Sequence, residues 1–184
     1  MDTMATIHIV DADAARAAIP ALCEVLADCI NGGASLGFML PFAPADATAY
    51  WGQVAEEVEA GRIILALAEL EGKLVGTVQV GLATKPNQPH RGDLMKLLVH
   101  RSARGCGLSR LLMETVEAEA ARRGRTLLVL DTATGSDAER IYPRFGWERV
   151  GMIPDYAMWP EGGFCDTTLF YKRIGSYALP GASS

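Results

Sequence analysis

A basic turn with two glycines, lying between an apolar segment and an amphipathic one, is the part of this sequence best suited to chemistry. It reads Ser-Ala-Arg-Gly-Cys-Gly at 102–107, and leucines recur at helical spacing from Leu108 onward. A strand, a turn and a helix in that order place free backbone N–H groups at a helix N-terminus, which is an anion site. Gly105 and Gly107 let the backbone approach a ligand closely, and Arg104 can add a charged hydrogen bond. The turn therefore predicts a pyrophosphate site, and with it a nucleotide-bearing cofactor.

The spacing of the turn excludes two other phosphate-binding motifs. A dinucleotide fingerprint would need a third glycine where Arg110 stands, and no G-K-[S/T] follows that would make a P-loop. The formal net charge of −5 argues against a nucleic-acid binder, which would carry a basic face. The arginines near the turn form a local cluster, which fits one phosphate ligand better than a polymer.

The elements that must position this turn follow from the spacing of apolar residues. Strands are expected at 6–10, 62–69, 74–82, 94–99, 126–131, 147–152 and 167–173, and helices at 14–30, 45–60, 107–123 and 136–145. Pro143 should kink the last helix, and the Pro/Gly-rich segment 154–166 should be a loop. The order β-α-α-β-β-β-α-β-α-β-β combines hairpins with a central βαβ unit, which predicts an α/β fold whose mixed sheet is flanked by helices.

Composition favours one ordinary folded domain spanning 1–184, with a core at about 6–174 and a loose C-terminal tail after Gly175. The 184 residues are 49% hydrophobic and 21% charged, which is typical of soluble proteins. Apolar runs are too short to span a membrane, and the N-terminus lacks a signal peptide's pattern, so a cytoplasmic location is expected. The four cysteines and three histidines show no ligand spacing, so we expect reduced thiols and no metal.

Two segments resemble the signatures of the GNAT N-acetyltransferases. The strand, the R-G-x-G turn and the following helix resemble the family's central motif, although Ser102 stands where that motif has Gln or Arg. The segment 138–147, with Tyr142 ahead of Phe-Gly-Trp, resembles the second signature. The resemblance implies the GNAT acyl-CoA fold, acetyl-CoA as co-substrate without a metal, and an N-acetyltransferase activity. It implies that the cofactor is bound by Leu97, Leu98, Val99, Arg104, Gly105, Cys106, Gly107, Leu108 and Ser109.

Within that family, residues 30–173 are most similar to the acetyltransferases that confer tabtoxin resistance. The similarity lies in the loop 32–39, in Lys85-Pro86-Asn87, in Lys96-Leu97 and in the segment 130–132. It implies a small-molecule amine as acceptor, of the kind found in amino-acid-like toxins. Ser35 and Phe38 in the glycine-rich loop are then candidates to contact that substrate. The loop itself could be a lid over a small ligand or a plain connection.

The resemblance also implies roles for three reactive side chains. Asp93 and Asp131, near neighbouring strand ends, are candidates for the base and for substrate binding, directly or through water. Tyr142 is the candidate acid for the departing thiolate. In this fold, the strand containing Leu97–Val99 separates from its neighbour and leaves backbone groups free for the pantetheine arm and the thioester oxygen.

Three alternatives remain open at this stage. The acceptor could be a protein amine or a polyamine instead of a small amino-acid-like molecule. The chain could instead be a non-catalytic acyl-CoA sensor, which should lack the acid or the base. A homodimer is possible, but nothing in the sequence decides it.

Overall fold

The computed structural model describes residues 5–175, so the C-terminal tail expected to be loose lies outside the described residues. The elements are β1 (Ala5–Ile9), α1 (Ala12–Asn31), α2 (Pro44–Glu59), β2 (Ile63–Leu70), β3 (Lys73–Leu82), β4 (Arg91–Val99), η1 (Arg101–Ala103), α3 (Leu108–Arg122), β5 (Leu127–Ala133), α4 (Asp137–Ile141), η2 (Pro143–Phe145), β6 (Glu148–Met158) and β7 (Phe164–Arg173). In this part of the chain, no helix is long and apolar enough to cross a membrane.

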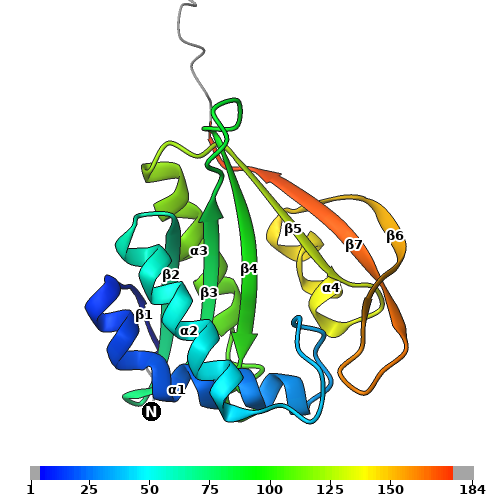
Figure 1. Ribbon diagram of the computed structural model, residues 1–184. Coiled ribbons are helices and arrows are strands. Elements are labelled where there is room, and N and C mark those ends of the chain that lie inside the picture. The colour runs from blue at the N-terminus through cyan, green and yellow to red at the C-terminus, as the bar shows by residue number, and fades with distance from the viewer. Residues whose placement is uncertain (1–4, 176–184) are drawn as a thin grey trace, which may run out of the picture.

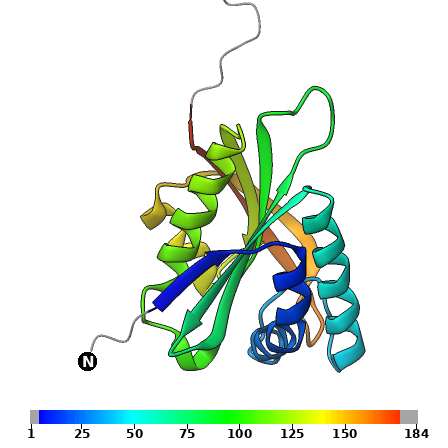
Figure 2. The ribbon, with the colours of Figure 1, turned by 90° about the vertical axis from the view of Figure 1, so that its left-hand side faces the viewer.

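All seven strands form one sheet in the order β1-β2-β3-β4-β5-β7-β6. Only β4 and β5 run parallel, and every other neighbouring pair is antiparallel. The predicted mixed sheet is therefore confirmed. Helices α1 and α2 cover one face of the sheet and α3 covers the other (Figures 1 and 2).

Each face of the sheet has its own hydrophobic core. Under α1 and α2, the apolar stripe of α1, which includes Leu22 and Leu26, packs with Trp51 of α2. Under α3, Leu112 and Val116 pack against strand residues. Helix α1 begins where the Asp11 side chain accepts a hydrogen bond of 2.9 Å from the Ala14 N–H, which satisfies one free donor of the first turn.

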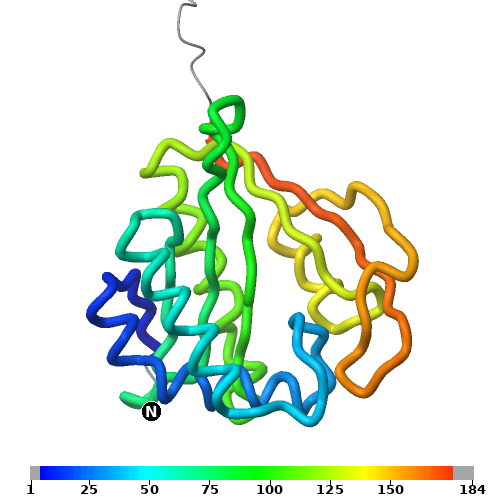
Figure 3. Tube along the Cα trace, in the orientation of Figure 1, coloured from blue at the N-terminus to red at the C-terminus, as the bar shows by residue number. Residues whose placement is uncertain are grey.

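The sheet opens in its centre because β4 and β5 pair over only three residues. Arg91, Gly92 and Asp93 pair with Leu127, Leu128 and Val129, and the parallel ladder ends there. Beyond that point the two strands diverge, and the gap widens toward their C-terminal ends (Figures 1 and 3). We call the region between the diverging backbones of β4 and β5 the wedge. The predicted separation of the segment containing Leu97–Val99 from β5 is confirmed.

The sequence prediction was wrong about the end of the chain. The segment 154–166, expected to be a loop, contains the end of β6, a short turn and the start of β7: β6 continues to Met158 and β7 already begins at Phe164. Pro154 is tolerated because β6 is an edge strand with an irregular register between Ile153 and Ala157, where no ladder bond from a proline nitrogen is needed.

Two smaller boundary differences concern β4 and the last helix. β4 starts at Arg91 instead of residue 94, because it pairs with both neighbours from its first residues. The expected helix 136–145 divides into α4 and the short 3-10 turn η2, which starts at Pro143. The predicted kink at Pro143 is therefore confirmed.

A buried polar cluster ties α3 to the end of the sheet. The Glu117 carboxylate accepts a hydrogen bond from Trp147 Nε1 at 2.9 Å and an ion-paired one from Lys172 Nζ at 2.5 Å. Lys172 Nζ also donates to the Phe145 carbonyl at 2.8 Å. Trp147 in turn packs its ring against Tyr142, with 6.1 Å between ring centroids. The cluster thus fixes the turn that follows α4.

We expect Glu117→Ala to lower the free energy of unfolding by about 3–5 kcal/mol, because it leaves a half-buried ammonium and an indole N–H without their acceptor. Glu117→Gln should cost less, since its amide oxygen can still accept from Trp147. Urea denaturation of both variants measures the difference. Equal stability of Glu117→Ala and the wild type would contradict a structural role for this cluster.

Candidate active site

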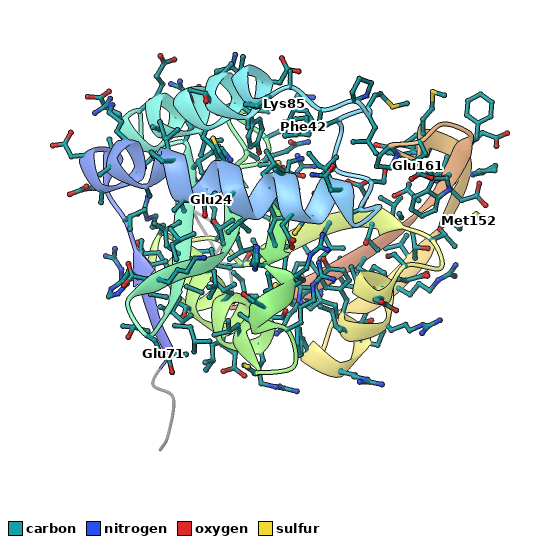
Figure 4. The ribbon with its side chains drawn as sticks, turned by 90° about the horizontal axis from the view of Figure 1, so that it is seen from below. Glu24, Phe42, Glu71, Lys85, Met152 and Glu161 are labelled. Carbon is teal, nitrogen blue, oxygen red and sulfur yellow. The ribbon has the colours of Figure 1, made fainter. Side chains whose placement is uncertain are left out.

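The loop between α1 and α2 closes the wide end of the wedge. Ser35 Oγ donates to the Met158 carbonyl at 3.2 Å, and the Leu40 N–H donates to the Pro160 carbonyl at 2.9 Å. On the other side, the Leu36 carbonyl accepts from Lys96 Nζ of β4 at 2.8 Å. Viewed from below, the loop carrying Phe42 reaches toward the hairpin that carries Met152 and Glu161 (Figure 4). The loop is therefore held from both sides of the wedge.

A β-bulge in β4 lies beside the wedge. Thr77 pairs with Leu98 and Gln79 with Met95, so Lys96 and Leu97 together oppose the single residue between them on β3. Lys96 has φ of +53°, a left-handed conformation that is uncommon for a residue with a side chain. Bulges bend the strand and redirect a side chain. Here Leu97 packs on the core under α3.

The side chain of Lys96 lies on the opposite side, among aromatic rings. Its Nζ is 5.4 Å from the ring centroid of Tyr50 and 6.0 Å from that of Phe38. Tyr50 is fixed by the buried amide of Gln79, whose Nε2 donates to the phenol oxygen at 3.1 Å. Burial lowers the pKa of the Lys96 ammonium, and the negative charge of Asp131 offsets part of that effect. Lys96 is thus a half-buried cation at the wedge.

The two predicted carboxylates lie on the same side of the sheet but in different settings. Leu94, Leu128 and Leu130 belong to the core under α3, so the alternation along each strand turns Asp93 and Asp131 to the other face. Asp93 pairs with Arg91 at 3.2 Å, beside the last parallel pair. Asp131 lies beyond the point of divergence, is exposed, and accepts from Thr167 Oγ1 at 3.0 Å. Asp131 therefore lies where the two strands have already diverged, whereas Asp93 lies at the last parallel pair.

Tyr142 is buried, with 5% of its surface exposed, and its ring packs on Phe170 at 5.6 Å between centroids. Burial raises the pKa of its phenol far above the ordinary value, and the charge of Asp131 raises it further. The phenol is therefore neutral at any physiological pH. It can donate a hydrogen bond, but it is a weak acid for complete proton transfer.

The glycine turn has the form of an anion site. Gly105 and Gly107 have φ of +80° and +75°, and a Cβ built on either would meet no atom within 4 Å. Gly107 is the N-cap of α3 and offers no side chain to cap it, so the first N–H groups of the helix face open space. Cys106 is exposed, and its thiol donates to the Arg104 carbonyl at 3.9 Å.

The two arginines of the turn are held from α1 by one carboxylate, that of Asp28. It accepts a hydrogen bond of 2.9 Å from the Arg101 N–H, contacts the Arg101 guanidinium, and lies 3.6 Å from His100 Nε2 and 4.0 Å from an Arg104 nitrogen. Arg104 Nε also donates to the Val99 carbonyl at 3.2 Å. Arg104 is therefore fixed beside the turn by protein groups, a constraint that the sequence did not reveal.

The structure gathers the predicted turn, Asp131, Tyr142, Ser35 and Phe38 around the wedge and the N-terminus of α3, and their roles stay predictions. Sequence reasoning missed the roles of Lys96, Tyr50 and Asp28. Two signals for Lys96 were available: its place in the resemblance and its charge inside the apolar stretch 94–99. Within residues 5–175, no group of three or more His, Cys, Asp or Glu side chains could hold a metal ion.

Comparisons with known proteins agree with this geometry. A model of the Acetyltransferase (GNAT) family matches residues 34–147. An uncharacterized N-acetyltransferase from the hisH-hisA intergenic region of Azospirillum brasilense is 30% identical over an alignment of 155 positions that covers 80% of this chain and 89% of that protein.

Solved structures share the fold at lower identity. The yncA protein of Salmonella typhimurium, determined with its cofactor acetyl-CoA, is 19% identical, covers 98% of this chain and 100% of its own, and has a TM-score of 0.79. An N-acetyltransferase from Staphylococcus aureus Mu50 is 16% identical, covers 94% and 100% of the two chains, and has a TM-score of 0.77.

The Asp28 contacts predict a pH-dependent contribution to stability. Burial alone raises the pKa of the Asp28 carboxyl, but hydrogen bonds from Arg101 and the nearby charges of His100 and Arg101 outweigh it and lower the pKa. A carboxylate with a lowered folded-state pKa stabilises the fold above its unfolded pKa of about 4, and this contribution is lost as the pH falls through the folded value.

We therefore expect Asp28→Asn to be about 2 kcal/mol less stable than the wild type at pH 7. The gap should narrow as the pH is lowered from about 4 toward 3. Glu24→Gln, one turn earlier on α1 and exposed, is the matched control and should change little. Denaturant unfolding at pH 7 and at about pH 3 measures the difference in free energy of unfolding between the variant and the wild type. A difference that does not change with pH would refute its electrostatic origin.

Proposed function

This chain belongs to the acetyltransferase (GNAT) family and is an N-acetyltransferase; we propose that it transfers the acetyl group of acetyl-CoA to the amine of a small molecule bound in the wedge. The observation that supports this most is the divergence of β4 from β5 directly before the glycine turn. It leaves a strand edge free for an extended ligand arm and places that edge next to a helix N-terminus able to hold a pyrophosphate.

The residues present fit acetyl-CoA. The open space at Gly105 and Gly107 admits a diphosphate against the N–H groups from Cys106 to Ser109. The β4 segment Leu97–Val99 lies beyond the ladder with β5, so its backbone can bind a pantetheine amide and an acyl oxygen. When bound, acetyl-CoA supplies the acyl carbon that the amine attacks and a thiolate that leaves.

Asp131 is the carboxylate best placed to act on the acceptor amine. It is exposed at the wedge beyond the last parallel pair, and Thr167 holds one of its oxygens. It can bind the ammonium and take its proton directly or through water, so that a neutral amine attacks. Asp93 shares that face, but its charge is already compensated by Arg91. We therefore assign the base to Asp131 and a supporting role in substrate binding to Asp93.

Tyr142 fits the role of a hydrogen-bond donor to the leaving sulfur. Its neutral state is secured by burial, so the donor proton is present throughout the physiological pH range. Because its pKa is so high, the thiolate is better stabilised by hydrogen bonding than by complete transfer of the phenol proton. The proton that the nitrogen loses during the transfer protonates the thiolate afterwards, which gives the neutral thiol and balances the reaction.

Ser35 and Phe38 limit the size of the acceptor. Their loop is bonded to the β6–β7 hairpin and to Lys96, so a broad peptide groove across the wedge would require these bonds to break. The fixed cation Lys96 also opposes a polyamine, which would bring several positive charges beside it. These features support a small acceptor over a protein or polyamine, and an amino-acid-like toxin lies within that class.

The first experiment is thiol release from acetyl-CoA against free amino acids, polyamines, aminoglycosides, tabtoxinine-β-lactam and a short peptide. Turnover of one small amine class would support the proposal. Turnover of the peptide alone would replace it with a protein acceptor. Tight acetyl-CoA binding with no turnover of any acceptor would point to an acyl-CoA sensor.

Tyr142→Phe should reduce kcat about a hundredfold, because the leaving sulfur loses its donor. Tyr142 is not part of the glycine turn that is proposed to hold the pyrophosphate. The dissociation constant of acetyl-CoA should therefore stay within about twofold of the wild-type value. Stopped-flow turnover and calorimetric binding measure the two quantities. An unchanged kcat would remove Tyr142 from the mechanism.

Asp131→Asn should lower kcat/KM about a hundredfold and flatten the rise of rate with pH, since the amide cannot take a proton. Asp93→Asn should cost less than tenfold, because Arg91 already neutralises this carboxylate. The two pH–rate profiles, recorded side by side, decide between the carboxylates. A larger fall in kcat/KM for Asp93→Asn than for Asp131→Asn would assign the base to Asp93 instead.

A further inference from the structure

Lys96 is a buried cation that the proposed transfer chemistry leaves unused. Its ammonium donates to the Leu36 carbonyl and faces the rings of Tyr50 and Phe38. Within residues 5–175, no carboxylate oxygen lies within 4.0 Å of it. Buried charges are normally paired, because removing an ion from water costs several kcal/mol. A cation kept half-buried without an anion is therefore ready to bind one.

The fold places this cation at the wedge through a specific backbone distortion. Regular alternation after Leu94 and Met95 would direct residue 96 into the apolar core under α3. The bulge instead gives that direction to Leu97 and turns Lys96 toward the loop and α2, at the cost of a left-handed φ. Strained backbone of this kind persists where the surrounding structure enforces it, and it gathers at functional sites.

Asp131 provides the opposite charge across the wedge. Its negative charge raises the pKa of Lys96, but the two groups do not approach within 4.0 Å, and each is hydrogen-bonded to another partner. Thr167 holds the Asp131 carboxylate from β7, and Leu36 holds the Lys96 ammonium from the loop. A fixed cation and a fixed anion on opposite sides of the wedge are complementary to a zwitterion.

We propose that Lys96 binds the carboxylate of the acceptor, so that the preferred acceptor is an amino acid whose carboxylate lies within a few atoms of the amine that is acetylated. This inference rests on the proposed function and adds its substrate class. The amine then lies toward Asp131, where its proton can be taken, while the carboxylate lies against Lys96. The rings of Phe38 and Tyr50 wall the apolar side of the same space.

The decisive comparison removes only the negative charge of the acceptor. Free L-amino acids and the corresponding L-amino acid amides carry the same amine and side chain. We expect the wild type to show a kcat/KM at least a hundredfold higher for the preferred acid than for its amide. Phosphonate analogues of the amino acids test whether any anionic group serves; a preference for the phosphonate over the acid would overturn the assignment to a carboxylate.

Lys96→Met is the variant that tests the residue. It should lower kcat/KM for the acid about a hundredfold, mainly through KM, while the rate with the amide stays within threefold. Lys96→Arg should restore part of the preference, because a guanidinium also binds carboxylates. Lys85→Met, the same substitution at an exposed loop lysine, is the control and should behave as the wild type.

Three results would overturn the inference. The wild type could use amides as well as acids. The kcat/KM of Lys96→Met could fall equally for the acid and for the amide, which would mean that Lys96 only supports the loop. Lys96→Met could keep the preference for acids. Misfolding is checked by melting the ligand-free variant, which should unfold in one cooperative transition close to that of the wild type, since the loss of the bond to Leu36 is offset by removal of the unpaired cation.

Failure of the proposed function itself has a different signature. If no amine is acetylated, calorimetry with the same acids and amides in the presence of CoA still decides the role of Lys96. Carboxylate recognition without turnover is supported if the wild type binds the acid but not its amide, and if Lys96→Met does not bind the acid. No binding of any acid to the wild type overturns it.

Discussion

The early end of the ladder between β4 and β5 is the constraint on which the rest of this structure depends. A central strand normally satisfies its backbone N–H and C=O groups on both sides, and buried groups left unpaired cost free energy. Here the parallel pairing stops at Asp93 and Val129. The segment of β4 that follows is left with one paired edge and one open edge. An extended ligand that carries its own amides can complete such an edge, and the helix N-terminus that follows β4 and the loop after α1 both lie beside it.

The surroundings of the wedge are rigid for identifiable reasons. Asp28 holds the arginines of the glycine turn from α1, and Glu117 holds the turn after α4, on which Tyr142 sits. The loop after α1 is bonded to both sides. Together these contacts fix the relative positions of the glycine turn, the turn that carries Tyr142 and the loop after α1. Such positioning accounts for much of the rate gain in transfer reactions, because reactants held in line need not find each other.

The parts of the site that the sequence predicted are the parts that local structure determines. The glycine turn is recognisable because a strand, a turn and a helix follow each other within twenty residues, and the glycines are needed for the left-handed φ that the structure has. Lys96 and Asp28 were missed because their roles depend on contacts distant in the sequence, 60 residues away for Lys96 and Leu36 and 73 for Asp28 and Arg101. The β6–β7 hairpin was missed because Pro154 and the glycines suggest a loop, whereas an edge strand tolerates them.

The choice of acceptor must come from side chains, because proteins that share less than a fifth of their residues with this chain share its fold almost completely. The backbone of the wedge supplies what every such transfer needs: an edge for the cofactor arm and a helix N-terminus for its phosphates. What it does not supply is charge. In this chain the charge comes from Asp131 on one side and from Lys96 on the other, and the bulge that exposes Lys96 costs backbone strain and the burial of a cation. The proposed acceptor accounts for both costs, because its carboxylate would offset the charge of Lys96 while its amine faces Asp131.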